Sequence, residues 1–111
     1  MDAIEASKVI SDEYSAKIIM GTVKRPKTAL ELINEFGIPD AACYRRIRSL
    51  ESKGLIECAD RRLTPEGKRV STYRSLIRSA RIYFEDGRIK ARFEWMSGEV
   101  EDLQVKLSDS L

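Results

Sequence analysis

The stretch "TALELINEFGIPDAACYRRIRSLESKGLIE", residues 28–57, contains two apolar patterns of helical period separated by a tight corner. Thr28 and Glu31 have the spacing of a capping box, which favours a helix start. Gly37 follows the last apolar residue of the first pattern, and glycine readily adopts the left-handed conformation that ends many helices. We therefore expect a short helix over residues 28–36 that stops at a glycine corner.

The second pattern predicts a helix over about residues 40–53, which follows the link "IPD" with Asp40 as its N-cap. Two helices joined by about three residues with a glycine at the corner are typical of a helix-turn-helix. At about 100° per residue, the buried stripe of this helix consists of Cys43, Ile47 and Leu50. Small and basic residues occupy the opposite side: Ala41, Arg45, Arg48 and Ser52, flanked by Ala42 and Ser49, with Arg46 nearer the apolar edge.

Upstream of this unit, residues 7–23 are expected to form a first helix. The segment "SDEYSAKIIMGTV" places apolar residues at helical spacing behind Ser11 and Asp12, whose oxygen atoms can cap backbone N–H groups. Pro26 disfavours helical geometry at Arg25 and opens a turn. The helical part of the sequence is thus predicted to contain three helices.

Downstream, residues 55–75 read as a β-hairpin. "PEGK" has proline at the second position of a turn, and "RVSTYRS" is rich in β-branched and aromatic residues. The alternative is a fourth helix in "TPEGKRVSTY", which the dense β-formers after Gly67 disfavour. Four basic residues gather near the turn of this hairpin: Arg61, Arg62, Lys68 and Arg69.

The segment "SLIRSARIYFEDGRIKARFEW", residues 75–95, predicts a second hairpin with Asp86-Gly87 as its two-residue loop. That loop pairs Glu85 with Arg88, Phe84 with Ile89, Ile82 with Ala91 and Ala80 with Phe93, so one face is apolar throughout and continues to Trp95. Such a face must pack on the domain or on a second subunit, because an isolated hairpin is not stable in water. Alternation at Leu103, Val105 and Leu107 suggests a third strand within residues 98–107.

Charge is distributed unevenly along the 111 residues. Residues 21–81 carry fourteen basic and seven acidic side chains, a net of +7, whereas residues 1–20 and 82–111 carry −2 and −3. A local basic region indicates a polyanionic partner, although Lys and Arg are also common on ordinary surfaces. With 42% hydrophobic residues the chain can bury a core, and we expect a domain over residues 1–76 with an extension over residues 77–111.

The composition also excludes several classes of site. The chain has no histidine and two cysteines, so we expect no zinc or other metal, no cofactor and no catalytic acid–base site, and hence no enzyme. Cys43 lies on the buried stripe, where an apolar thiol is the ordinary outcome, and Cys58 is read as incidental. The N-terminus lacks the pattern of a signal peptide and no apolar run is long, so we expect a cytoplasmic protein without a membrane segment.

The segments "KTALELINEFGIPDAACYRRIRSLESKGLIE" (27–57) and "RLTPEGKRVSTYRS" (62–75) resemble the winged-helix DNA-binding domains of the ArsR-like group of prokaryotic, notably archaeal, transcriptional regulators. The resemblance implies an α+β winged helix-turn-helix of three helices and a β-hairpin wing, here followed by a C-terminal β-hairpin extension. Metal-sensing members carry cysteine motifs or His/Asp/Glu sets at the dimer interface, and the matching residues are missing from this sequence.

The resemblance also implies contacts with double-stranded DNA. The helix starting at Thr28 would direct its N-terminal N–H groups and hydroxyl at a phosphate. The recognition helix, about 40–53, would lie in the major groove, and the wing, 55–75, on the backbone or in the minor groove. The expected DNA-binding residues are Thr28, Ala41, Ala42, Tyr44, Arg45, Arg46, Arg48, Ser49, Arg61, Arg62, Lys68 and Arg69.

The sequence therefore predicts a sequence-specific DNA-binding transcriptional regulator. We expect a homodimer, with two recognition helices over half-sites one helical turn apart. The alternative is a winged-helix protein–protein interaction module of a transcription or replication complex, and RNA binding is a third possibility. Arginines on the recognition face and wing favour nucleic acid, whereas an apolar exposed recognition face would favour a protein partner.

Overall fold

The structure is a computed structural model that describes residues 1–106. Over this range the chain has four helices and two antiparallel sheets, which confirms the α+β part of the predicted fold. The helices are α1 (Ala3–Ser11), α2 (Glu13–Gly21), α3 (Ala29–Phe36) and α4 (Asp40–Ser52). The strands are β1 (Lys27–Thr28), β2 (Ile56–Leu63), β3 (Arg69–Ser75), β4 (Ile77–Glu85), β5 (Arg88–Trp95) and β6 (Val100–Lys106).

The prediction of one helix over residues 7–23 is wrong, because the chain bends at Asp12, whereas the helix cap predicted at Ser11 and Asp12 is confirmed for Asp12. This residue has an extended backbone (φ −71°, ψ 122°) and its carboxylate accepts the N–H of Ser15, so it ends α1 and caps α2. An additional helix, α1, precedes the bend and starts at Asp2, which caps the N–H of Glu5. The described residues therefore contain four helices and not the expected three.

The helix pair of residues 28–57 forms as predicted. Thr28 and Glu31 make the reciprocal capping box of α3, and Gly37 has the left-handed conformation (φ +66°). The expectation that Asp40 caps α4 is wrong: Pro39 occupies the N-cap position, Asp40 is the first helical residue, and no side chain caps this end. The proline ring fixes φ at this corner, and Pro39 has the extended backbone (φ −58°, ψ 141°) that is usual for an N-cap residue.

β2 and β3 form the predicted hairpin, so the alternative of a fourth helix in residues 64–73 is wrong. Thr64 and Lys68 close the turn, with the N–H of Thr64 donating to the carbonyl of Lys68 over 2.7 Å. A bulge lies between Cys58 and Asp60, and β1 pairs with β3 to complete a sheet of order β1-β3-β2.

The second sheet has the order β4-β5-β6. The four pairs expected from the Asp86-Gly87 loop are all present, which confirms the register. The suggested third strand is present as β6, paired with β5 as far as Lys106, while Leu107 lies outside the described residues. The C-terminal extension is therefore a sheet of three strands and not a hairpin alone.

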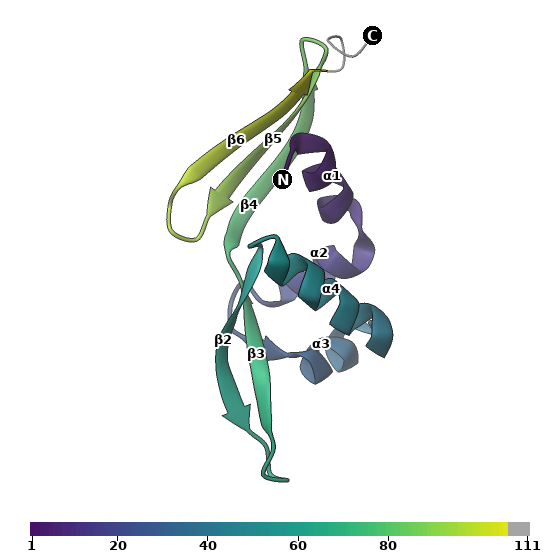
Figure 1. The fold of residues 1–111 in the computed structure, drawn as a ribbon, viewed down its shortest axis with the longest axis vertical. Coiled ribbons are helices and arrows are strands. Elements are labelled where there is room, and N and C mark those ends of the chain that lie inside the picture. The colour runs from purple at the N-terminus through teal and green to yellow at the C-terminus, as the bar shows by residue number, and fades with distance from the viewer. Residues whose placement is uncertain (107–111) are drawn as a thin grey trace.

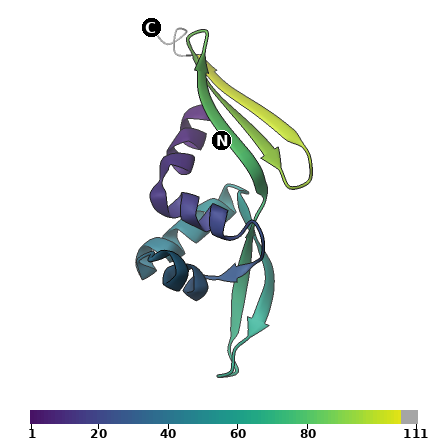
Figure 2. The ribbon, with the colours of Figure 1, turned by 180° about the vertical axis from the view of Figure 1, so that it is seen from behind.

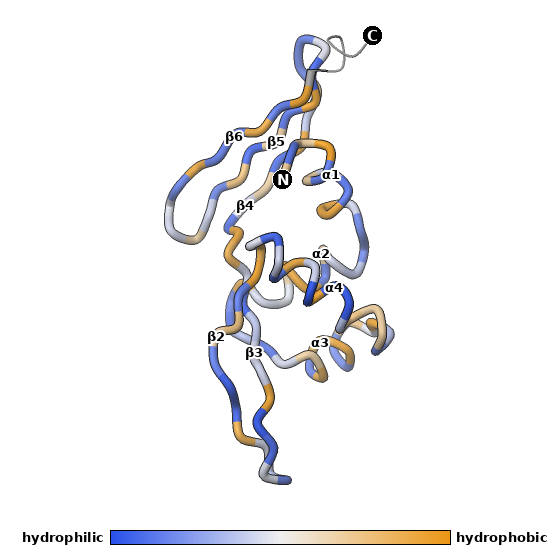
Figure 3. Tube along the Cα trace, in the orientation of Figure 1, coloured by the Kyte–Doolittle hydropathy of each residue, from blue (hydrophilic) through white to orange (hydrophobic). Residues whose placement is uncertain are grey.

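One buried cluster joins both parts of the chain. Ala3 and Ala6 of α1 are fully buried (0% exposed) and pack on the apolar face of the second sheet with Ala91 and Phe93. Figures 1 and 2 show the two hairpins pointing to opposite ends of an elongated molecule of 57 × 29 × 20 Å. In Figure 3 the hydrophilic stretches of β2 and β3 lie beyond the helices. The extension thus packs on the helical part through α1.

Candidate nucleic-acid interface

The exposed face of α4 carries two arginines that have no acidic partner among residues 1–106. Arg45 and Arg48 are exposed, as are Ala41 and Tyr44, while Cys43, Ile47 and Leu50 are buried as the helical period predicted. Within residues 1–106, neither Arg45 nor Arg48 forms an ion pair with any acidic group. An arginine on a helix surface that is not paired with a carboxylate keeps its N–H donors available for a phosphate or for the edges of bases.

Arg46 behaves differently from its neighbours, because it is bound inside the protein. Its Nε and Nη2 atoms donate to the two carboxylate oxygens of Asp12 over 2.9 and 3.1 Å, and its guanidinium lies 5.8 Å from the ring centre of Tyr14. These hydrogen bonds hold the pKa of Asp12 well below its usual range and raise the pKa of Arg46. Arg46 therefore joins α4 to the corner between α1 and α2.

Three further expected contacts are already engaged within the fold. Ala42 is 8% exposed and belongs to the core, so it offers little surface. Thr28 is also 8% exposed, and its hydroxyl oxygen accepts the N–H of Glu31. Ser49 is half-buried and accepts a hydrogen bond from Nζ of Lys53 over 2.8 Å. Fewer residues of α3 and α4 are therefore free to contact DNA than the sequence suggested.

The β2–β3 hairpin exposes all four of its expected basic residues. Arg62 donates from Nη1 to Oε1 of Glu31 over 3.0 Å, so it is tied to the start of α3. The pKa of Glu31 is lowered, first by the Thr28 N–H that its carboxylate accepts and further by Arg62. Across the part of the chain that the structure describes, no acidic side chain pairs with Arg61, Lys68 or Arg69.

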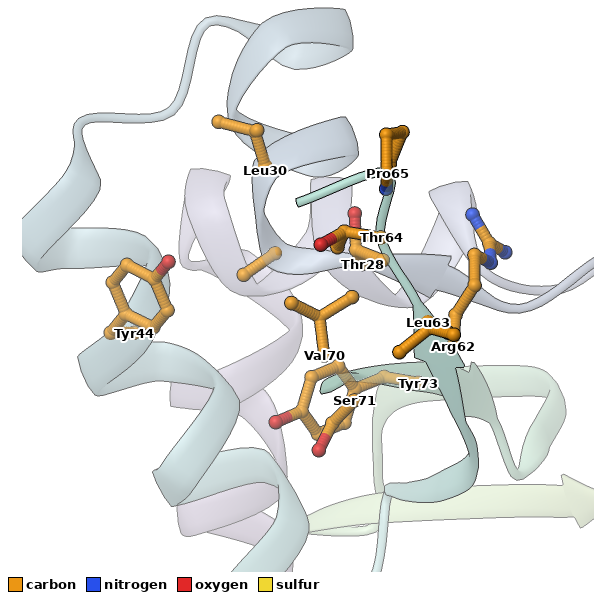
Figure 4. A pocket seen from close by; sticks show the side chains of 11 residues that line it. Thr28, Leu30, Tyr44, Arg62, Leu63, Thr64, Pro65, Val70, Ser71 and Tyr73 are labelled. Carbon is orange, nitrogen blue, oxygen red and sulfur yellow. The ribbon is translucent and has the colours of Figure 1, made fainter. Parts of the chain in front are cut away.

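A hollow of about 420 Å³ separates the hairpin from α3 and α4. Figure 4 shows Tyr44 approaching it from the α4 side, with Val70 and Tyr73 of β3 below Thr28 of β1 and Leu30 of α3. Leu30, Leu63 and Tyr44 are 62%, 62% and 52% exposed although they are large and apolar. Sequence reasoning missed Leu30 and Leu63; the available signal was that Leu30 lies off the buried stripe of α3.

The two cysteines have the environments that their positions suggested. Cys43 is buried, its Sγ lies 3.8 Å from the carbonyl oxygen of Ala29, and burial raises the pKa of its thiol. Cys58 is exposed in β2. Among residues 1–106, no three His, Cys, Asp or Glu side chains gather into a group that could bind a metal ion.

Comparisons with known proteins do not identify this arrangement. No protein-family model matches the chain, and a sequence search of curated proteins finds no match. No helix within the described range has the length and apolar character needed to cross a membrane. The geometry and charge of the surface formed by α4 and the β2–β3 hairpin are therefore the features that indicate a function.

Proposed function

We propose that this chain is a sequence-specific, double-stranded DNA-binding transcriptional regulator of the winged-helix type, similar to the ArsR-like group. In this proposal α4 enters the major groove and the β2–β3 hairpin lies along the backbone or in the minor groove as a wing. One observation carries the proposal. Five exposed cations on α4 and the wing have no acidic partner in residues 1–106: Arg45, Arg48, Arg61, Lys68 and Arg69.

The physical reason is counterion release. Each phosphate neutralised by a protein cation frees a condensed counterion, which favours binding at low salt. A cation already paired to a carboxylate supplies less of this effect, because its partner must be displaced. Arg46 and Arg62 are therefore assigned structural roles, and the unpaired five are assigned to DNA.

A second candidate function is supported by the hollow beside α4. Leu30, Tyr44 and Leu63 expose apolar surface around it, and aromatic and apolar side chains in a concave site are typical of protein interaction surfaces. A winged-helix protein interaction module would use this apolar surface and would not need Arg45 and Arg48.

Binding to a duplex library across a salt series separates the two functions. If the protein binds DNA, the logarithm of its affinity falls linearly with the logarithm of the salt concentration, with a slope of about −0.9 per neutralised phosphate. Replacing Arg45 and Arg48 together by alanine reduces that slope by about one per lost phosphate contact and costs about 1–3 kcal/mol for each base contact removed. The readout is a fluorescence anisotropy titration of the wild type and the double variant.

The matched control replaces Lys8 of α1 and Arg88 of β5 by alanine, because neither cation forms an ion pair within residues 1–106. This change removes the same charge outside α4 and the wing, and it leaves the salt slope near that of the wild type. Equal losses of DNA affinity in both double variants would mean that binding depends on net charge alone and not on the α4 surface. Absence of duplex binding at low salt, together with loss of a protein partner on Leu63→Asp, would establish the interaction module instead.

A further inference from the structure

β4 is an edge strand whose outer side pairs with no strand of residues 1–106. The second sheet has the order β4-β5-β6, so within this range β4 pairs with β5 alone. Figure 2 shows β4 at the margin of its sheet, beside α1 and α2. Long apolar edge strands promote association with other chains, and natural proteins usually shorten, charge or cover them.

The turn geometry determines which backbone groups of β4 are free. Asp86 and Gly87 both have positive φ (52° and 72°), as in the two-residue type I′ hairpin, so Glu85 and Arg88 form a hydrogen-bonded pair. Hydrogen-bonded and non-hydrogen-bonded pairs alternate along an antiparallel ladder. The N–H and C=O groups of Ala80, Ile82 and Phe84 therefore point away from β5, and within residues 1–106 they bond to no other segment.

An apolar projection and an apolar cleft lie at the two ends of this free edge. Phe84 is 80% exposed near the turn. At the other end, Ala80 borders a cleft of about 280 Å³ whose lining also includes Ile10, Ile19 and Met20 from α1 and α2. Met20 is 67% exposed. Both features lie on the face of the sheet that α1 covers, because Ala80 and Phe84 share the apolar face of β4.

We propose that β4 is the interface with a second copy of this chain, in which two β4 strands pair antiparallel about a two-fold axis through Ile82. This register places Ala80 opposite Phe84 of the second copy, so each Phe84 ring enters the other copy's cleft. Ile82 faces Ile82, and the three outward residues of each strand supply six N–H···O bonds. The interface is isologous, since the same projection and cleft are used twice.

Charge and side-chain pairing support the same register. Arg81 lies opposite Tyr83 of the second copy, a pairing that allows a cation–π contact. Arg78 lies near the other copy's turn, which carries Asp86. A register with the axis through Arg81 would instead place two arginines in direct opposition, which is destabilising.

The other edge of the sheet is a poorer candidate. β6 carries Glu101 and Asp102 next to Glu99, and acidic residues of this kind protect an edge from pairing. The hollow beside Leu103 and Gln104 is bordered mostly by charged and polar side chains. Within the described residues it offers no apolar cleft that could hold the Phe84 ring of another copy. Pairing of β4 with β6 would also not close, and it would give open chains of subunits.

The proposed axis has a consequence for DNA binding. Two-fold axes of antiparallel strand pairs run normal to the sheet, so the two wings point in opposite directions along the long axis of the dimer. Each copy then meets its own DNA segment. The half-sites one helical turn apart that the sequence suggested would require a different interface. The β4 interface does not depend on the proposed DNA binding, because no residue of α4 or the wing contributes to it.

Sedimentation equilibrium of the wild type and two variants tests the interface. We expect the mass of two chains for the wild type, and a dimer dissociation constant raised about tenfold or more by Phe84→Glu, which puts a charge into an apolar cleft. Met20→Glu places a charge in the cleft itself and should raise the dimer dissociation constant by a similar factor. Leu63→Glu is the matched control, since it puts the same charge at an exposed apolar position of the wing and leaves the dimer unchanged. Circular dichroism shows that the variants fold.

Disulfide trapping tests the register independently. Opposed residues of a hydrogen-bonded antiparallel pair have Cα atoms about 5.5 Å apart, within the range of a disulfide. Ile82→Cys in a Cys58→Ser background should therefore link two chains under mild oxidation, whereas Leu103→Cys in the middle of β6 should not. A monomeric wild type, a dimer insensitive to both Phe84→Glu and Met20→Glu, or preferential linking at Leu103→Cys would each overturn the proposal. DNA binding by a monomer would leave the regulator proposal standing.

Discussion

At the scale of single residues, three neighbouring arginines have two different roles. Arg45 and Arg48 extend from α4 without an acidic partner in residues 1–106, while Arg46 is held by both carboxylate oxygens of Asp12. Asp12 also caps α2, so one carboxylate stabilises a helix start and anchors a second helix. Arg45 and Arg48 are three positions apart and so share the exposed face of α4, whereas Arg46 lies about 100° further around the helix, on the side that meets Asp12.

The Asp12 carboxylate makes stability depend on pH. Its pKa is lowered in the folded chain, so its contribution is complete above the unfolded pKa, about 4, and is lost as pH falls toward the folded value. We expect Asp12→Asn to reduce the free energy of unfolding by about 1–2 kcal/mol near neutral pH, a value kept small because both partners are partly exposed. Asparagine retains the helix cap.

Urea denaturation between about pH 7 and about pH 3 checks this prediction. The difference between the wild type and Asp12→Asn should narrow below about pH 4. Glu13→Gln is the control, because Glu13 forms only an exposed ion pair with Lys17. A difference that stays constant over the whole range would show that the Asp12–Arg46 pair does not stabilise the fold.

At the scale of elements, local signals and packing contacts act together. α3 is defined at both ends by its own residues, through the Thr28–Glu31 capping box and the left-handed Gly37. α2 ends where it meets another helix: a Cβ atom added at Gly21 would lie 2.5 Å from Cε2 of Phe36. Gly21 therefore allows α2 and α3 to approach closely.

Replacing Gly21 by alanine separates helix propensity from packing. Alanine would be favoured by up to about 1 kcal/mol in a helix, yet the clash with Phe36 costs about 1–3 kcal/mol. We expect Gly21→Ala to lower the thermal unfolding midpoint. In a Phe36→Leu background, where the ring is absent, the same substitution should be neutral or stabilising. A stabilising effect of Gly21→Ala alone would contradict the close approach of the two helices.

At the scale of the whole molecule, the two sheets belong to one packing unit. Leu76 lies between β3 and β4, where its N–H donates to the carbonyl of Leu55 and its carbonyl accepts the N–H of Met96. α1 packs on the second sheet, and the buried cluster runs from the helices to Ala91 and Phe93. The expected boundary after residue 76 therefore separates two segments of chain that share a core.

The shared core predicts cooperative unfolding. Trp95 stacks on Phe93, with ring centres 5.5 Å apart, and as the single tryptophan it reports on the second sheet. Helical circular dichroism reports on the N-terminal part. We expect the two signals to change at the same urea concentration. Phe93→Ala should lower both midpoints together and reduce the free energy of unfolding by about 3–5 kcal/mol. Separate transitions would show that residues 1–76 and the extension fold as independent domains.

The sequence predicted most elements because their signals are local. The α3 cap, the glycine corner and the Asp86-Gly87 turn each depend on residues within a few positions, and the alternation of apolar residues set the strand register. The cap at Asp12 was predicted, but the separate helix α1 before it was missed, because an aspartate within an apolar pattern is compatible either with a continuous helix or with a new start. Its partner, Arg46, is 34 residues away.

By itself, the sequence determined the α+β composition, the α3–α4 corner, both hairpins and the buried stripe of α4, since these follow from periodicity and turn chemistry. Only the tertiary structure decided which charged groups are paired, which apolar side chains stay exposed and which strand edge is free. Those properties depend on contacts between residues distant in the chain. Arg46, Leu63 and Phe84 show the difference, because their surroundings are built by segments that local patterns do not connect.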